Sequence, residues 1–181
     1  MSRVSQLSPR DSLAKLLHCL GFVYARYVLC ASASAVCTLR SPLNFIPIHN
    51  GEVSIGDTTF IWSGRNDGKH QEGVALAVQR KLMSACVSWT PINERLLYAR
   101  FRHTADFLSF IVAYAPTENA DTLVKKQFYA ELEVAIAQCG KNDLKVILGD
   151  FNAVTGSSSR IQGDAALGPW GRGIPNVNAD L

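Results

Sequence analysis

The sequence predicts a layered α/β fold, and three observations along the chain support that prediction. Arg95–Phe101 and Phe107–Ala113 are strand-like runs joined by a short polar turn, so they predict a hairpin. Asp121–Cys139 carries apolar residues at helical spacing. Leu144–Leu148 is a continuous apolar run, typical of a strand inside a sheet. A strand pair, a crossover helix and a further central strand describe a layered α/β domain.

The first fifty residues predict a segment unrelated to this domain. They are apolar and rich in Ser and Ala, and basic residues ahead of small residues imitate a secretory signal. Arg26 interrupts the apolar block, and Tyr27–Leu39 is shorter than the ~20 residues that span a bilayer. We therefore expect a buried helix or a poorly folded extension in an intracellular protein, cytoplasmic or nuclear, rather than a membrane protein. A cleaved signal or anchor in residues 1–40 is the alternative.

Residues 51 to about 154 resemble an ordinary α/β domain that begins with two short strands. Thr58–Trp62 is β-branched and aromatic, and the turn-rich Ser63–Gly68 follows it. Gly73–Val78 predicts a second strand. After the predicted hairpin, Pro116 ends the strand because proline has no N–H to donate to a sheet. Residues 155–181 are rich in Gly, Ser and Asn and predict a loop region.

The predicted helix at Asp121–Cys139 has recognisable ends and one apolar face. Asp121 or Thr122 can cap its first turn, and Gly140 can end it. Side chains three and four residues apart form the apolar face, namely Leu123, Phe128, Leu132, Ala135, Ile136 and Cys139. This face predicts that the helix packs across the sheet.

Composition excludes some classes of protein and leaves others open. The chain has 181 residues, 48% of them hydrophobic and 18% charged, which suits one domain with a buried core and excludes wholesale disorder. Its net charge of +3 neither predicts nor excludes nucleic acid binding. The 5 cysteines form no CxxC pair, so the sequence indicates neither a zinc site nor a disulfide framework, and we expect free thiols. Composition defines no oligomeric state.

The first candidate for chemistry is Gly149-Asp150-Phe151-Asn152, at the end of the last predicted strand. Functional groups of α/β sheets gather where strands end and loops begin. Alternation along the strand places Asp150 and Asn152 on one face and directs Phe151 into packing. The carboxylate can orient or deprotonate water, and the amide can hold a phosphoryl oxygen. In the alternative interpretation, both side chains only satisfy backbone groups in a turn.

The second candidate is Tyr114-Ala115-Pro116-Thr117, at the end of the strand that begins at Phe107. The Tyr114 hydroxyl can bond a phosphate, and Thr117 can add another donor for substrate binding. The alternative is a packed strand tyrosine followed by a turn.

Together these motifs resemble the endonuclease/exonuclease/phosphatase superfamily. Tyr-Ala-Pro-Thr, a helix of four to five turns and Gly-Asp-Phe-Asn follow in the order of that family. Other segments are similar to one branch, the apurinic-like endonucleases of non-LTR retrotransposons and the craniofacial development protein 2-like proteins. These segments are Phe60–Gly64, Glu72–Val78, Asn93–Phe101 and Gly163–Asn178. The resemblance covers roughly residues 51 to 181.

The resemblance implies an α+β fold, a two-sheet αβ sandwich, with a divalent-metal site at one edge. Asp150 would align or activate water and contact the metal indirectly, Asn152 would stabilise the phosphoryl centre, and Tyr114 would contact a phosphate. Oxygen-rich ligands favour Mg²⁺ or Mn²⁺ over zinc. The implied substrate is nucleic acid, with DNA favoured by the retrotransposon-like motifs.

Two parts of the family pattern have no clear counterpart in this chain. The family begins with a strand bearing an asparagine and a second strand that ends in a metal-binding glutamate. Here Glu52 is expected in a loop, and Asn44 lies between prolines. The family's closing Ser-Asp-His-type segment is not found, since none of His18, His49, His70 and His103 follows an aspartate. We therefore expect a partial domain that lacks terminal strands and a complete active site.

Three hypotheses about function follow from these patterns. The first is a Mg²⁺-dependent nucleic acid phosphodiesterase, derived from a retrotransposon. The second is a catalytically inactive remnant or interaction module with the same scaffold. The third, a secreted or membrane-anchored phosphodiesterase, depends only on the apolar block in residues 1–40.

Overall fold

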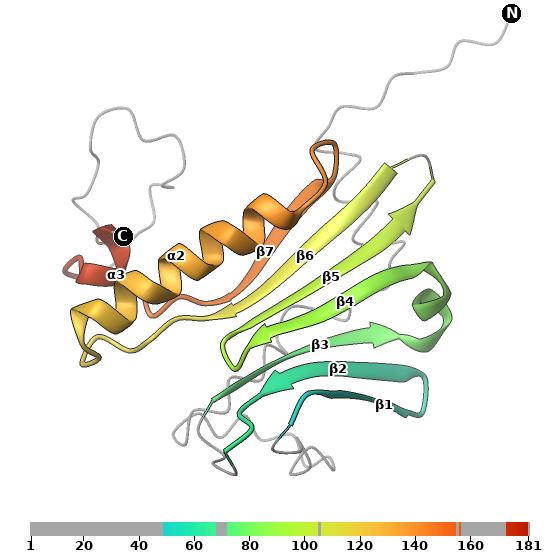
Figure 1. Cartoon of the computed structure of the whole chain (residues 1–181), viewed down its shortest axis with the longest axis horizontal. Coiled ribbons are helices and arrows are strands. Elements are labelled where there is room, and N and C mark those ends of the chain that lie inside the picture. The colour runs from blue at the N-terminus through green and yellow to red at the C-terminus, as the bar shows by residue number, and fades with distance from the viewer. Residues whose placement is uncertain (1–48, 68–71, 105, 155, 157–172, 181) are drawn as a thin grey trace, which may run out of the picture.

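The protein has three layers, a three-stranded sheet, a four-stranded sheet and one long helix (Figure 1). The computed structural model describes residues 49–67, 72–104, 106–154, 156 and 173–180. In chain order the elements are β1 (Gly51–Ile55), β2 (Thr58–Gly64), β3 (Gly73–Gln79), the 3-10 helix η3 (Arg80–Ala85), β4 (Cys86–Asn93), β5 (Leu96–His103), β6 (Asp106–Tyr114), α2 (Thr122–Gln138), β7 (Leu144–Asp150) and α3 (Val177–Asp180). This arrangement confirms the predicted α+β two-sheet sandwich.

The two sheets differ in how their strands are joined. The first sheet has the order β1-β2-β3, and both of its pairs are antiparallel. The second has the order β4-β5-β6-β7, in which only the β6–β7 pair is parallel. A parallel pair needs a crossover connection, and α2 supplies it. The carboxyl ends of β6 and β7 therefore meet at one edge of the sheet.

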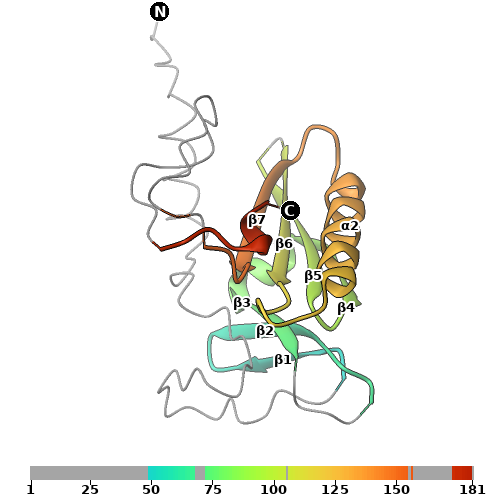
Figure 2. The same ribbon diagram turned by 90° about the vertical axis from the view of Figure 1, so that its left-hand side faces the viewer.

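Alternation along β5 and β6 creates two hydrophobic cores, one on each face of the second sheet. Leu97, Ala99 and Phe101 face the first sheet and pack with Ile61 and Leu76. The intervening side chains of β5 and β6 pack against α2, which lies along the other face of the sheet (Figure 2). Because neighbouring strand residues point to opposite faces, one strand serves both cores.

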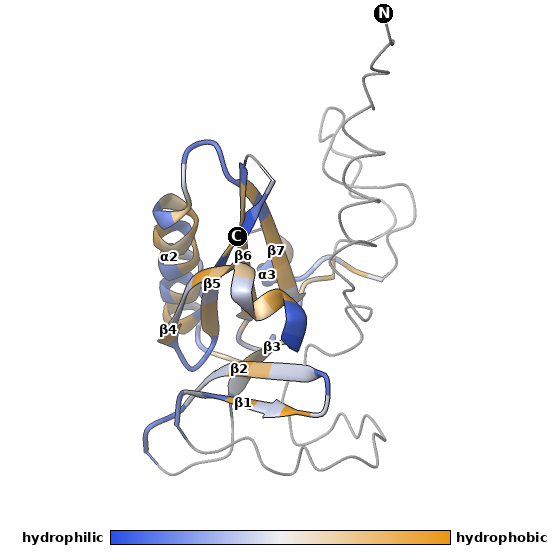
Figure 3. Ribbon diagram, turned by 90° about the vertical axis from the view of Figure 1, so that its right-hand side faces the viewer, coloured by the Kyte–Doolittle hydropathy of each residue, from blue (hydrophilic) through white to orange (hydrophobic). Residues whose placement is uncertain are grey.

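Helix α2 has the predicted start and most of the predicted apolar face. The Asp121 carboxylate accepts a hydrogen bond from Leu123 N at 2.7 Å, which caps the first turn. Hydrophilic and hydrophobic residues alternate along the helix (Figure 3), and Phe128, Leu132 and Ala135 are buried. Leu123 was placed on this face wrongly, since it is 75% exposed. It lies five residues before Phe128, well away from the buried face, whereas Lys125 lies three residues before and is buried.

The predicted strands are confirmed, but the position of β7 differs from the prediction. Its apolar composition predicted a strand inside the sheet, yet β7 is the last strand of the second sheet in the described part of the chain. Val146 and Leu148 pack against the core between the sheets. Ile147 points the other way and is 40% exposed, so only one side of the strand is covered.

Two strands were not predicted. The first, β1, pairs with β2 through the two-residue turn Gly56–Asp57, in which Gly56 has a φ of 57°. Glu52 therefore lies in a strand, and its prediction as a loop residue was wrong. The second, β4, contains Pro91 and two register irregularities, features that proteins tolerate in edge strands.

Some predictions fall on residues outside the described part. These include the N-terminal segment up to residue 48 and most of the Gly-rich region, from 157 to 172. The boundary between an unrelated segment and the domain at residue 51 thus stays a prediction. Among the described helices, none has the length and apolar character needed to cross a bilayer.

Candidate functional site

The parallel pairing of β6 with β7 brings the two predicted motifs together. Tyr114 and Asp150 are register partners at the ends of these strands. One step further on, Ala115 N donates a hydrogen bond to the Asp150 carbonyl at 2.9 Å. Residues 36 positions apart in the chain thus become neighbours at one sheet edge, because the crossover helix α2 lets the two strands run parallel.

Gly149 allows the two strand ends to approach closely. A Cβ atom at this position would lie 1.9 Å from the Ala113 carbonyl oxygen, which is far inside van der Waals contact. Any larger residue would push β7 away from β6. The glycine therefore determines how closely Asp150 lies to the end of β6.

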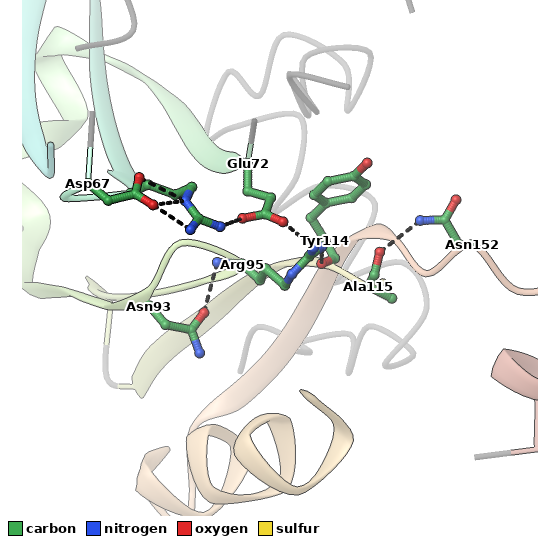
Figure 4. A network of polar contacts seen from close by, with 8 residues as sticks. Asp67, Glu72, Asn93, Arg95, Tyr114, Ala115 and Asn152 are labelled. Atoms are coloured by element: carbon green, nitrogen blue, oxygen red, sulfur yellow. Dashed lines mark hydrogen bonds and ion pairs between the residues drawn. The ribbon is translucent and has the colours of Figure 1, made fainter. Parts of the chain in front are cut away.

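The turn after β7 presents one exposed carboxylate and one anchored amide. Asp150 is exposed, and its Oδ1 accepts a hydrogen bond from Asn152 N at 2.9 Å. Asn152 has a φ of 47°, so the strand alternation that was predicted to reach it ends at Asp150. Asn152 Nδ2 donates to the Ala115 carbonyl at 2.8 Å, and its oxygen points away from that contact (Figure 4). Phe151 packs against the core under α2, as predicted.

Both interpretations of this turn therefore describe part of what is present. The side chains of Asp150 and Asn152 do satisfy backbone groups, as the alternative interpretation expected. Each contact uses only one end of a side chain with two polar ends, so it also orients the other end. An oriented carboxylate beside an oriented amide is suited to holding water and a phosphoryl group.

Tyr114 is held in the core beside this turn, and Thr117 lies outside it. Tyr114 is 5% exposed and belongs to the core between the two sheets. The Arg95 guanidinium carbon lies 5.2 Å from the centre of its ring, a cation–π distance. Thr117 is exposed in the loop after β6, where its carbonyl accepts a hydrogen bond from Ala120 N at 3.0 Å.

Behind Tyr114, ion pairs join the two sheets. Arg95, just before β5, donates to the Tyr114 carbonyl at 3.2 Å and to Glu72 Oε1 at 2.6 Å. Glu72, just before β3, also pairs with Arg65, which in turn bonds Asp67 with Nε at 2.9 Å from Oδ1 (Figure 4). The two carboxylates raise the pKa of Arg65 above its usual value. Glu72 and Arg95 lie in two segments that carry the family resemblance, Glu72–Val78 and Asn93–Phe101, but the sequence assigned neither residue a role.

The turn after β7 offers oxygen ligands for a divalent cation, but the described residues do not form a complete set of ligands. The Asp150 carboxylate and the Asn152 amide oxygen are the hard oxygen donors that Mg²⁺ prefers. Within the described ranges, however, no cluster of three His, Cys, Asp or Glu side chains is placed to hold a metal ion. Glu52 is exposed on β1, where its Oε2 accepts a hydrogen bond from Trp89 Nε1 at 3.1 Å. His103 lies at the far end of the β5–β6 hairpin, paired in register with Asp106.

Comparison with known proteins identifies relatives for most of the chain. No protein-family model matches it. Craniofacial development protein 2 from Bos taurus is 31% identical over 126 residues, which cover 70% of this chain and 21% of that protein. The protein of the same name from Tragulus javanicus is 30% identical over 126 residues, with the same coverage. The chain thus spans about a fifth of the length of the curated relatives it matches, at 21%.

These relatives confirm the resemblance to craniofacial development protein 2-like proteins. The further link to retrotransposon endonucleases stays a prediction. Most of this chain is therefore homologous to a part of craniofacial development protein 2.

Proposed function

We propose that this chain is part of a divalent-metal-dependent phosphodiesterase domain of the endonuclease/exonuclease/phosphatase type that acts on DNA and derives from a retrotransposon. The observation that supports it best is the meeting of Tyr114, Asp150 and Asn152 at the parallel ends of β6 and β7. Such strand ends are where functional groups of layered α/β proteins gather. The sequence similarity to craniofacial development protein 2 is a second, independent support for the proposal.

Each residue has a role that its surroundings permit. Asp150 is exposed and held by Asn152 N, so it can orient an attacking water and accept its proton. Asn152 is held through Nδ2, which leaves its oxygen directed away from Ala115. Tyr114 has its ring held by Arg95, and its hydroxyl points away from that guanidinium (Figure 4); in the proposed role this hydroxyl contacts a phosphate oxygen. Thr117 is exposed in the loop after β6, where its hydroxyl is available as a further donor.

Mg²⁺ or Mn²⁺, when bound, would neutralise negative charge that develops on the leaving oxygen. Asp150 and Asn152 would hold it through their oxygens, and the described residues place no cluster of three His, Cys, Asp or Glu side chains around it. The protein's own contribution is to hold the carboxylate, the amide and the phenol in fixed positions.

Cleavage assays test the proposal directly. The purified protein is incubated with an abasic-site duplex, supercoiled plasmid and single-stranded DNA, in Mg²⁺, Mn²⁺ or EDTA. A catalytic chain predicts metal-dependent cleavage that Asp150→Asn lowers by at least about 100-fold, whereas the incomplete active site expected from the sequence predicts no cleavage. Asp106→Asn makes the same chemical change at the opposite end of β6, on an exposed residue, and is expected to keep wild-type activity.

The outcomes separate the hypotheses. Cleavage that survives EDTA or the Asp150 substitution would show that another activity is responsible. A well-folded protein that cleaves none of these substrates would favour an inactive remnant or interaction module. The retrotransposon origin is tested separately, by asking whether the genomic sequence downstream encodes a reverse transcriptase.

A further inference from the structure

Two asparagines from the C-terminal part of the chain contact the turn after β7. Asn176 Nδ2 donates to the Asn152 carbonyl at 2.8 Å. Asn178 Nδ2 donates to the Pro116 carbonyl at 2.8 Å and to the Asn152 carbonyl at 3.3 Å. Asn178 lies on α3, and its carbonyl accepts a hydrogen bond from the Tyr129 hydroxyl of α2 at 2.9 Å. One side chain therefore joins the loop after β6 to the turn after β7.

The orientation of the Asn178 amide is fixed by these carbonyls. Both neighbours are acceptors, so the amide nitrogen must face them, and its two protons serve the two contacts. Asn178 is 4% exposed, and in the described part of the chain its Oδ1 is a buried acceptor with no hydrogen-bond partner. A buried unpaired acceptor is unfavourable, and native structures contain few of them.

The backbone at Asn152 is unusual as well. Its φ of 47° lies in the left-handed region, which few residues other than glycine adopt, although asparagine tolerates it better than most. Here two side-chain donors hold the carbonyl of the left-handed residue itself.

We propose that Asn178, assisted by Asn176, is the positioning residue of the candidate site. It ties the Pro116 carbonyl to the Asn152 carbonyl, and so fixes the loop that follows Tyr114 relative to the turn that follows Asp150. This inference depends on the proposed function, for which the relative position of these groups matters. Without the clamp, the Asn152 backbone can relax, and its side chain then loses its direction toward Ala115.

The test uses the full chain and the Asn178→Leu variant. Leucine has the same branching as asparagine but a larger side chain, and it lacks both the donors and Oδ1. Asn178→Ala is therefore measured beside it, and the same loss of kcat in both variants excludes overpacking as the cause. We expect kcat on the abasic-site duplex in Mg²⁺ to fall about 10- to 100-fold, with KM changed less than about threefold, since misplacement of reacting groups by about 1 Å can cost that much. Asn176→Ala removes one donor from a half-buried position and is expected to lower kcat by a smaller factor.

A structural control separates positioning from general loss of stability. Asp143→Asn weakens a buried ion pair next to the other end of β7 and leaves the clamp intact. At a temperature where all variants are folded, Asp143→Asn is expected to keep wild-type kcat. An Asn178→Leu protein with wild-type kcat, or an equal loss in both variants, would overturn the proposed positioning role.

Hydrogen exchange keeps the two proposals distinguishable. If the wild-type chain cleaves nothing, the proposed function fails, but the clamp can still be measured at the Asn152 and Ala115 amides. These amides donate to Asp150 and report on the turn directly. We expect their exchange to be about tenfold faster in Asn178→Leu than in Asp143→Asn at matched global stability. Equal exchange rates in the two variants would refute the clamp, whatever the activity.

Discussion

The two ends of the β6–β7 pair are built differently. Near the start of β7, the Asp143 carboxylate accepts from Arg100 Nε at 2.7 Å and from Ser109 Oγ at 2.7 Å. The Arg100 guanidinium carbon also lies 3.9 Å from the centre of the Phe107 ring. At the other end of the pair, Asp150 is exposed and Asn152 has a left-handed backbone. The carboxylate at the start of β7 is buried and fully hydrogen-bonded, whereas the carboxylate at the end of β7 is exposed to solvent.

This difference shows how one pair of strands can serve stability and chemistry at once. A buried carboxylate with several donors is rigid but has no capacity left for a ligand. An exposed carboxylate contributes little to stability, so it is available for substrate or water. Because the two ends are separated by the length of β7, substitutions at one end can be tested without disturbing the other.

The largest effect is expected from Gly149→Ala, which adds a methyl group between β6 and β7 next to the candidate site. The new methyl group would lie 1.9 Å from the Ala113 carbonyl oxygen, so β7 must shift. We expect a loss of about 3 kcal/mol in the free energy of unfolding, measured by urea denaturation. Gly56→Ala is the matched control, because Gly56 has a φ of +57° with no atom within 4 Å of the new group. It should cost about 1 kcal/mol, from backbone strain alone, and equal costs would contradict the close approach.

Asp143→Asn and Asp150→Asn make the same chemical change near the two ends of β7. Asp143 is 3% exposed in its ion pair with Arg100, so Asp143→Asn should cost about 2 kcal/mol of unfolding free energy. Asp150 is exposed, and an asparagine there keeps an oxygen that can accept from Asn152 N, so Asp150→Asn should change stability by less than about 0.5 kcal/mol. Urea midpoints of both variants measure the difference. A large loss from Asp150→Asn would mean that its carboxylate is structural.

The elements of this fold could be predicted where local composition is strong. Alternation and apolar runs identified β2, β3, β5, β6 and β7, and a cap with helical spacing identified α2. The strand β1 was missed because the hairpin signal Gly56–Asp57 was overlooked, and β4 was missed because Pro91 is atypical of strands. Leu123 was misplaced because an apolar residue in a helix suggests burial even when it lies off the packed face.

The site could be predicted only as far as chain order determines it. A strand, a helix and a parallel strand place Tyr114 and Asp150 at one edge without knowledge of any contact. The supporting side chains come from distant segments, with Asn178 lying 62 positions from Pro116. Arg95 reaches Glu72 across the two sheets in the same way. Such contacts depend on tertiary packing, and no spacing rule in the sequence encodes them.

Lowering the pH should reduce the contribution that Asp143, near the start of β7, makes to the free energy of unfolding. Hydrogen bonds from Arg100 and Ser109 lower the pKa of Asp143 to about 2. Because this pKa lies below the ordinary value of about 3.9, the ionised carboxylate stabilises the fold above pH ~4 and loses that effect as the pH falls toward 2. Urea midpoints of wild type and Asp143→Asn should therefore converge over this range. A gap between wild type and Asp143→Asn that is unchanged at pH 2 would mean that the charge of Asp143 is not the source of its stabilisation, and that its value lies in hydrogen bonds that asparagine cannot reproduce.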